Sequence, residues 1–360
     1  MSPFEHLMPD SVDAALEGLG RAPAARAEGA RFLAGGTNLL DLMKADLTRP
    51  TRLVDVHRLP LQAIQATPDG GLQLGALATN AATAAHPLVR DRYPLLAAAL
   101  LAGASPQIRN MATNGGNLLQ RTRCAYFYDA QLPCNKRRPG SGCPAREGLA
   151  RSHAILGASD QCVATHPSDF CVALRALDAT VHVQSARGSR SIPMADFHRL
   201  PGDRPDLDTV LQPDELITHL SLPPAPAGFA RHATYLKLRE RASYAFALVS
   251  VAAALDLDGD GRIRQARMAL GGVAHKPWRL PEAEALLQGR EPGPDAFGEA
   301  AARLLQGAQP CGAPGTDNAF KLPMAHRAVV RALSLATDGE LTNTGPLAGL
   351  ATAAARREDA

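Results

Sequence analysis

The sequence contains no run of 18 apolar residues and no large excess of either charge. Because a helix needs about 20 predominantly apolar residues to cross a bilayer, no membrane-spanning helix is expected in this chain. The 38 basic and 35 acidic residues leave a net charge of +3, which does not indicate nucleic acid or an anionic membrane as a partner. The N-terminus carries Glu5 where a signal peptide would carry basic residues, so no signal peptide is expected on this chain.

Two frequent cofactor motifs are missing as well. The glycine pair Gly35-Gly36 does not extend to the G-x-G-x-x-G of a Rossmann unit, so nicotinamide binding is not implied. The six cysteines form neither the C-x-x-C pairs of a zinc ribbon nor a ferredoxin-type run. They also lack the dense, even spacing of a small secreted disulfide scaffold.

Length and composition indicate a folded protein with more than one domain. A hydrophobic content of 46% over 360 residues can fill two or three domain cores. The proline-rich segment 223–228 is typical of a linker. One domain is therefore expected over 1–222 and a second over 229–337, with a flexible tail over 338–360.

Strands followed by helices are expected in the second domain. Strand-like alternation on both sides of Asp258-Gly259-Asp260-Gly261 predicts a β-hairpin. Asp256, Asp258 and Asp260 imitate the start of a calcium loop, but its twelfth position is Arg267 instead of glutamate, so the hairpin turn is preferred. Residues 280–307 and 321–337 are expected to form two helices that pack on the sheet.

Two glycine segments have the character of a cofactor site. Residues 31–44 combine a short apolar strand, Gly35-Gly36 and a helix start, an arrangement whose amides can bind a pyrophosphate. As a pattern, this glycine pair is equally compatible with an ordinary tight turn. A second small-residue run, Thr113 to Asn117, allows the same close approach of backbone to a ligand. The two segments together predict a clasp that holds one ligand from opposite sides.

Four of the six cysteines fall between residues 124 and 162, which favours a metal site. Nine residues separate Cys124 from Cys134, eight separate Cys134 from Cys143, and eighteen separate Cys143 from Cys162. Loop thiolates at such spacings can converge on an iron–sulfur cluster, because loop closure over these lengths costs little entropy. Zinc, and free thiols or disulfides, remain as alternatives at this point.

The other candidate residues have structural interpretations beside the functional ones. Cys171 lies on the apolar face of a predicted helix, which favours the core over a ligand role. Cys311 lies in a loop with no partner nearby and is expected to be inert. His166 precedes a proline and can be a ligand, a base or a capping residue. The basic segment Lys136-Arg137-Arg138 is expected to be solvated or to face a partner.

An ordered set of segments resembles the FAD-binding medium subunit of the xanthine dehydrogenase/aldehyde oxidoreductase family of molybdo-flavoenzymes. The segments are FLAGGTNLLDLMK, PQIRNMATNGGNLL, HPSDFCVAL, LQPDELITHLSLP, LKLRERASYAFALVSVAAAL and ALGGVAHKPWR. The cysteine-rich insertion at about 121–163 resembles that of the periplasmic aldehyde oxidoreductase branch, whose flavin subunit also carries a [4Fe-4S] cluster. The flavin subunit of 4-hydroxybenzoyl-CoA reductase is another relative with such an insertion.

This resemblance implies an α+β fold. A two-subdomain FAD-binding domain of the PCMH (vanillyl-alcohol-oxidase-like) type would be followed by a smaller α+β domain, like the C-terminal domain of CO dehydrogenase flavoproteins, with a sheet covered by helices. The implied FAD-binding residues are Leu33, Ala34, Gly35, Gly36, Thr37, Asn38, Leu39, Leu40, Gly103, Thr113, Asn114, Gly115, Gly116, Asn117, Asp169, Ile217 and Lys237.

The resemblance also implies individual roles. Asp169 would accept hydrogen bonds from flavin hydroxyls, Ile217 would flank the isoalloxazine ring, and Lys237 would lie near its electron-rich edge. The implied cluster ligands are Cys124, Cys134, Cys143 and Cys162, with Cys171 as the rival for the fourth position.

The function implied is electron transfer within a heterotrimer. A large partner subunit would hold the molybdenum cofactor, and a small one would hold [2Fe-2S] clusters. FAD in this chain would take electrons from these clusters and pass them to an external acceptor. Alone, the chain is not expected to oxidise aldehydes. Periplasmic location through co-export with a signal-bearing partner is expected, with the cytoplasm as the alternative. A self-contained flavin oxidoreductase and a protein with a structural zinc are the rival functions.

Overall fold

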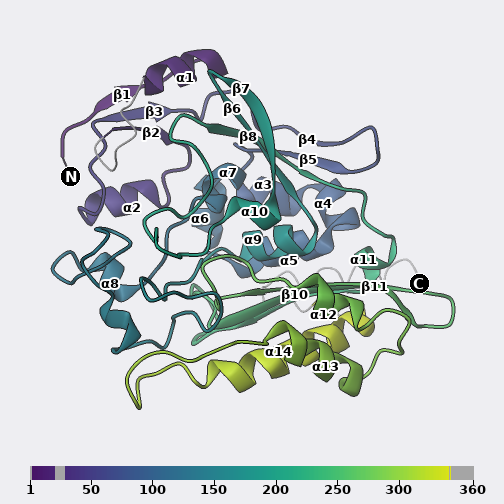
Figure 1. Cartoon of the computed structure of the whole chain (residues 1–360). Coiled ribbons are helices and arrows are strands. Elements are labelled where there is room, and N and C mark those ends of the chain that lie inside the picture. The colour runs from purple at the N-terminus through teal and green to yellow at the C-terminus, as the bar shows by residue number, and fades with distance from the viewer. Residues whose placement is uncertain (1, 21–28, 340, 342–360) are drawn as a thin grey trace.

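The computed structural model describes residues 2–20, 29–339 and 341 and contains three β-sheets (Figure 1). The first sheet is parallel, with the order β1-β3-β2. Its elements are β1 (Glu5–Leu7), α1 (Val12–Leu19), β2 (Ala30–Leu33), α2 (Leu39–Lys44) and β3 (Arg52–Asp55). Helix α1 begins after Ser11, whose side chain accepts a hydrogen bond from the amide of Ala14, and it ends at Gly20 with φ 70°.

The second sheet is antiparallel and has the order β4-β5-β8-β6-β7. Its strands are β4 (Ile64–Ala66), β5 (Leu72–Gly75), β6 (Thr180–Ser185), β7 (Gly188–Pro193) and β8 (Leu216–Leu222). The remaining elements of this region are α3 (Asn80–Ala85), α4 (Pro87–Arg92), α5 (Pro94–Ala102), α6 (Pro106–Met111), α7 (Asn114–Leu118), α8 (Ala125–Tyr128), η1 (Pro144–Arg146), α9 (Asp169–Ala176) and α10 (Met194–Phe197). Proline occupies the first turn of α4, α5 and α6. Its missing N–H costs no hydrogen bond at this position, whereas a proline cannot continue a preceding helix, so the three helices are separate.

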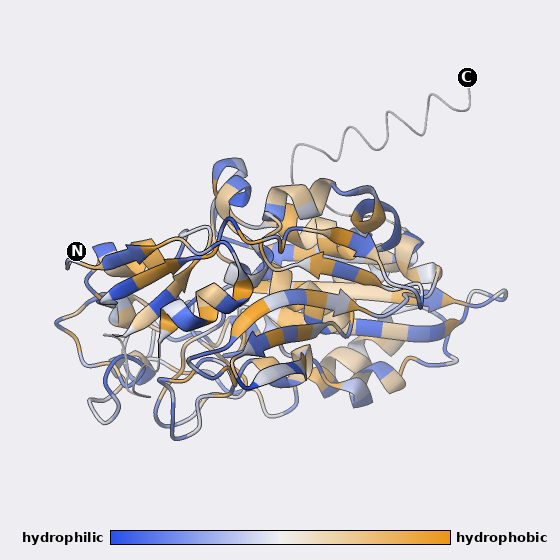
Figure 2. Cartoon of the chain, turned by 90° about the horizontal axis from the view of Figure 1, so that it is seen from above, coloured by the Kyte–Doolittle hydropathy of each residue, from blue (hydrophilic) through white to orange (hydrophobic). Residues whose placement is uncertain are grey.

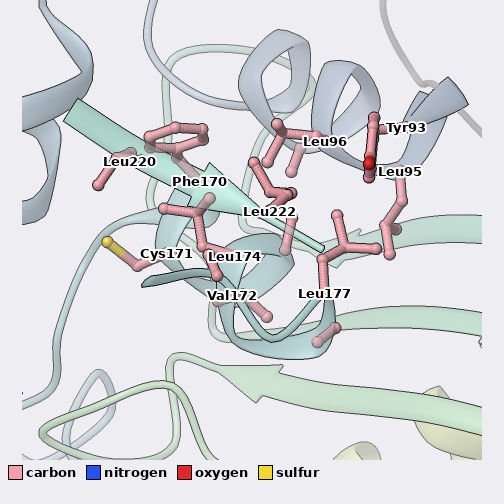
Figure 3. Packing of buried hydrophobic residues seen from close by; sticks show 14 of the residues in the cluster. Tyr93, Leu95, Leu96, Phe170, Cys171, Val172, Leu174, Leu177, Leu220 and Leu222 are labelled. Atoms are coloured by element: carbon pink, nitrogen blue, oxygen red, sulfur yellow. The ribbon is translucent and has the colours of Figure 1, made fainter. Parts of the chain in front are cut away.

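Helix α5 is the centre of the largest core. Eight of its nine residues are buried, as expected for a helix that is apolar on all sides. The helix packs against α3, α4 and α9 and also against strands of the third sheet. Figure 3 shows Leu95 and Leu96 of α5 in one cluster with Leu174 of α9 and with Leu220 and Leu222 of β8. The cluster joins the second sheet to the third.

The third sheet forms the C-terminal part and is antiparallel, with the order β11-β10-β9. Its elements are α11 (Gly228–Arg231), β9 (Ala233–Leu238), β10 (Val249–Leu257), β11 (Ile263–Gly271), α12 (Pro281–Ala285), α13 (Pro294–Leu304) and α14 (Lys321–Thr337). Strand β10 is buried on both faces over eight of its nine residues, because α14 packs on one face and α5 and α9 on the other. Figure 2 shows an elongated molecule with hydrophobic residues along the interior strands.

The structure confirms the hairpin expected around Asp258, where β10 and β11 pair in antiparallel register. A helix also covers 321–337, as predicted. The single helix expected over 280–307 is wrong: α12 and α13 are separate, and Gly289 with φ 75° lies between them. Most of the tail expected over 338–360 lies outside the described residues. Within the described part of the chain, no helix is long and apolar enough to cross a membrane.

The packing of α13 on the third sheet predicts a large mutational effect. Phe297 is 2% exposed and belongs to the core that α13 and α14 form with β10 and β11. Phe297→Ala is expected to lower the free energy of unfolding by about 3–5 kcal/mol, through lost apolar contact and the cavity left behind. Glu299→Ala, on the exposed side of the same helix, is the control and should cost less than about 1 kcal/mol. Chemical denaturation of both variants measures the difference, and equal losses would contradict this description of the core.

Candidate functional site

The two glycine segments of the sequence lie directly against each other. A Cβ atom at Gly35 would stand 1.8 Å from the carbonyl oxygen of Met111, so the backbone after β2 touches the backbone that leads into Thr113. Gly36 has φ 70°, a conformation that side chains disfavour. The turn is continued by α2, whose N-cap is Asn38. The structure thus brings Leu33–Leu40 and Thr113–Asn117 together, as the predicted clasp requires.

Asn38 links the first glycine segment to the residues before the cysteines. Its Oδ1 accepts a hydrogen bond of 2.9 Å from the amide of Arg121. Its Nδ2 is buried without a hydrogen-bond partner among the described residues. A buried donor left unpaired costs free energy, so an acceptor such as a phosphate or ribose oxygen fits this position. FAD offers such acceptors.

The second glycine segment is held rigidly by its asparagines. Asn114 is fully buried, and its amide donates to the carbonyl of Gly75 at 3.1 Å and to Thr83 Oγ1 at 2.9 Å. Asn117 donates to Asn80 Oδ1 at 2.7 Å. The Thr113 hydroxyl caps α7 by accepting from the amide of Gly116. Asn114 therefore supports the clasp from inside, and its side-chain amide forms its hydrogen bonds with protein groups.

The predicted flavin residues Asp169 and Lys237 form a buried ion pair. Lys237 Nζ lies 2.8 Å from Asp169 Oδ2, and the two side chains are 2% and 8% exposed. Lys237 also donates to the carbonyl of Ala102, and Tyr235 donates to Asp169 Oδ1 at 2.7 Å. Gly103 adjoins the pair, because a Cβ there would lie 3.2 Å from Asp169 Oδ2. The flavin roles predicted for Asp169 and Lys237 stay predictions, and both residues carry a structural contact that the sequence did not indicate.

Ile217 of β8 is buried beside the second glycine segment, with its Cβ 3.6 Å from the Cβ position of Gly115. Of the predicted flavin residues, Asp169 alone lines a cavity of about 140 Å³, and neither Ile217 nor the glycine segments line it. Asp169 and Ser168 line it from one domain, Phe246 and Gly271 line it from the other, and Cys124 lines it from the cysteine segment. The cavity therefore adjoins a predicted flavin residue and a predicted cluster ligand.

The four predicted cluster ligands lie around a second, smaller cavity. Cys124, Cys134, Cys143 and Cys162 all line this space of about 10 Å³. Asn135 closes the loop between two of them: its side chain accepts from the amide of Gly142 at 2.7 Å and donates to the carbonyl of Gln161 at 2.9 Å. Loop residues far apart in sequence thus bring the four cysteines together around one space.

The protonation of these thiols suits metal binding at one pair. A hydrogen bond between Cys143 and Cys162 lowers the pKa of the Cys143 thiol to about 6 and raises the pKa of Cys162. One proton shared by two sulfurs leaves a thiolate, which is the form that binds metals. Burial raises the pKa of Cys124 to about 11.

The four cysteines do not form the most compact group of possible metal ligands in the described chain. Zinc–sulfur bonds of about 2.3 Å place tetrahedral ligands about 3.8 Å apart. Among the described residues, the group whose ligand atoms all lie within 4.8 Å of one another is His166, Cys171 and His198, and it includes none of the four. Four cysteines around one space can hold a single metal ion or a multi-iron cluster.

Cys171, the predicted rival for the fourth ligand, lies elsewhere. It is fully buried in the α9 core with Leu174, at the edge of the cluster in Figure 3, whereas Cys162 packs with Cys124 and Cys134. Burial raises the pKa of Cys171 to about 12. His166 and His198, which flank this thiol, are also buried, and their ring centroids lie 4.2 Å apart.

Two expectations for polar and sulfur groups are wrong. Lys136 is 3% exposed instead of solvated, because it pairs with Asp208 and donates to the carbonyl of Pro205 at 2.7 Å. Burial alone would raise the pKa of Asp208, but the charges of Arg121 and Lys136 hold it well below the usual range. Cys311, expected to stand apart, packs against the cysteine cluster.

The cysteine segment is tied by its backbone to the C-terminal domain. The amides of Ile155 and Leu156 donate to the carbonyl of Val273 at 2.9 and 3.0 Å, and the amide of His166 donates to that of Ala274 at 3.0 Å. From the same domain, the amide of Gly312 donates to the carbonyl of Arg146. Lys136, which pairs with Asp208, ties the segment to the FAD-binding domain as well.

Two site residues were not identified from the sequence. Tyr235 holds Asp169, and His153 places Nε2 3.0 Å from Cys124 Sγ. For Tyr235, the signal was its position two residues before Lys237 on a strand, which places both on one face. A lone histidine in a loop offers no comparable signal.

Comparisons with known proteins agree with this geometry. The family described as "FAD binding domain in molybdopterin dehydrogenase" matches residues 2–225, and "CO dehydrogenase flavoprotein C-terminal domain" matches residues 234–336. The chain is 52% identical over 313 residues to the aldehyde oxidoreductase FAD-binding subunit PaoB of Escherichia coli (strain K12), covering 86% of this chain and 92% of that one. It is 30% identical to the nicotine 6-hydroxylase medium subunit of Paenarthrobacter nicotinovorans, over 77% and 80% of the two chains.

A solved structure shares the whole architecture. The carbon monoxide dehydrogenase of Hydrogenophaga pseudoflava contains a chain that superposes with a TM-score of 0.72 at 26% identity, covering 94% of this chain and 98% of that one. The family matches, the sequence similarity and the fold agree over both domains. The chain belongs to the FAD-binding medium subunits of the molybdenum-containing aldehyde oxidoreductase and xanthine dehydrogenase family.

Proposed function

We propose that this chain carries FAD and a [4Fe-4S] cluster and transfers electrons within a complex that oxidises aldehydes to carboxylic acids. The observation that carries the proposal is the 140 Å³ cavity that both Asp169 and Cys124 line. A flavin held at Asp169 and a cluster held at Cys124 would share this cavity. Bound there, the two groups would supply redox centres, one a carrier of electron pairs and the other of single electrons.

The protein supplies binding, orientation and charge. The glycine clasp would hold the dinucleotide, and the Asp169–Lys237 pair would fix the cavity wall beside it. The four cysteines would hold the cluster between the two domains, away from bulk water. The four cysteines around one space, and the thiolate left by the shared proton of Cys143 and Cys162, support a metal centre at this position.

The substrate assignment rests on the similarity to an aldehyde oxidoreductase subunit at 52% identity, against 30% for the nicotine 6-hydroxylase subunit. We infer partners of two kinds: a large subunit with the molybdenum cofactor and a small one with [2Fe-2S] clusters. Electrons would leave through FAD to an external acceptor. Assembly in the periplasm by co-export with a signal-bearing partner is part of the same proposal.

The first test is cofactor content. Anaerobically purified protein should contain about four irons, about four sulfides and one FAD per chain, with an EPR signal after dithionite reduction. One zinc without sulfide would overturn the cluster assignment and leave the flavin assignment standing. Aldehyde turnover should require co-expressed partner subunits, and turnover by the isolated chain would refute the relay function.

The glycine contact predicts selective loss of FAD. In Gly35→Ala, the new Cβ would overlap the Met111 carbonyl, so the two glycine segments must move apart. The FAD-to-protein ratio, measured by absorbance, should fall at least several-fold while iron is retained. Gly259→Ala is the matched control, because no atom of the described chain lies within 4 Å of that Cβ position. Unchanged FAD content in Gly35→Ala would contradict the clasp.

The cysteine positions predict which thiols hold iron. Cys134→Ser and Cys162→Ser should each remove the cluster and leave most FAD bound, because the glycine clasp and the cysteine loop are separate. Cys171→Ser and Cys311→Ser are the controls and should retain iron. Iron and flavin analysis of the four variants decides the ligand set: equal loss of both cofactors in Cys134→Ser, or iron loss in Cys171→Ser, would contradict it.

A further inference from the structure

Three residues form a wall between the two cavities. Thr122, Cys124 and His153 line both the larger cavity beside Asp169 and the smaller one among the cysteines. Cys124 is a proposed cluster ligand, and Thr122 holds it by accepting a hydrogen bond from its amide at 3.3 Å. His153 has no part in the function proposed above. Its place in the wall gives it contact with both sites.

The imidazole of His153 is aimed at a cysteine sulfur. Its Nε2 lies 3.0 Å from Cys124 Sγ, and the residue is 3% exposed. A cysteine that binds metal is a thiolate, which can only accept a hydrogen bond. The ring nitrogen must then carry the proton and donate it to sulfur. Nδ1 is left as the unprotonated nitrogen of a neutral ring, and it has no hydrogen-bond partner within the described parts of the chain.

The main chain fixes the position of this ring. The carbonyl of His153 accepts hydrogen bonds of 2.9 Å from Lys321 Nζ and of 2.9 Å from Asn318 Nδ2, and its amide donates to the carbonyl of Ala150 at 2.8 Å. Lys321 is fully buried and also donates to the carbonyl of Gly272 at 2.8 Å. The C-terminal domain thus holds the histidine against the cysteine from behind. A donor placed so rigidly loses little entropy on bonding the sulfur.

We propose that His153 is a positioning residue that raises the reduction potential of the cluster through an Nε2–H···Sγ hydrogen bond to Cys124. The inference rests on the proposed function, because it needs a cluster on the four cysteines. Hydrogen bonds to cysteine sulfur are one of the means by which a protein sets a cluster potential. An added electron increases the negative charge on the sulfurs, so the bond is stronger in the reduced state and favours reduction. The bond lies at the wall that faces the flavin cavity.

The test is an EPR-monitored redox titration of the full, cofactor-loaded protein. His153→Leu removes the donor and keeps a side chain of similar bulk, whereas His153→Gln retains an amide N–H at the same distance along the side chain. His153→Leu is expected to lower the equilibrium constant for cluster reduction about tenfold, which for one electron is a shift of about 59 mV to lower potential. In His153→Gln the cluster potential should stay close to that of the unmodified protein, because the amide N–H replaces the lost donor. The FAD potential should stay unchanged in both.

A matched control is His198→Leu. His198 is equally buried and donates to the carbonyl of Leu118 at 2.8 Å, and it does not line the cysteine cavity. An unchanged cluster potential in His153→Leu, or an equal shift in His198→Leu, would overturn the inference. If His153→Leu loses iron and His153→Gln keeps it, the N–H donor supports the cluster as proposed; loss from both variants would overturn the role of the donor. Absence of iron from the unmodified protein would instead refute the proposed function.

Discussion

The buried ion pair between Asp169 and Lys237 joins the two domains at the point where the candidate cofactor sites meet. Asp169 begins α9 in the FAD-binding domain, and Lys237 lies on β9 of the C-terminal domain. Removing one partner from a buried pair leaves an uncompensated charge and typically costs about 3–5 kcal/mol. Tyr235 donates to the other oxygen of the Asp169 carboxylate, and Lys237 donates to the carbonyl of Ala102 as well. The relative position of the domains, and with it the cavity between them, depends on this contact.

The cysteine segment uses the same junction. It has little regular structure, yet much of it is buried, because the C-terminal domain supplies hydrogen bonds to its backbone and the FAD-binding domain contacts it through side chains such as Lys136. Buried backbone groups need such partners. A loop held from two sides can keep four thiols close together without the short spacings of a zinc ribbon. This explains how a metal site can exist where the sequence shows only cysteines separated by eight or more residues.

Buried cations surround the two cavities. Lys237 pairs with Asp169, Lys136 pairs with Asp208, and Lys321 is held by two backbone carbonyls. Burial lowers the pKa of Lys321 to about 7. In the two ion pairs the carboxylate offsets the charge of the lysine, so neither pair adds net charge beside its site. The hydrogen bond from His153 is the directed polar contact to the proposed cluster ligand Cys124.

The sequence by itself determined the local features: the glycine segments, the hairpin at Asp258, the helix over 321–337 and the family to which the chain belongs. These depend on periodicity, on residues with special backbone freedom and on segments that resemble known proteins. Only the tertiary structure decided which distant groups meet. The contact of Gly35 with Met111, the pairing of Lys136 with Asp208, the separation of Cys171 from Cys162 and the placement of His153 on Cys124 are all long-range. Such contacts follow from the packing of whole domains, which no local pattern encodes.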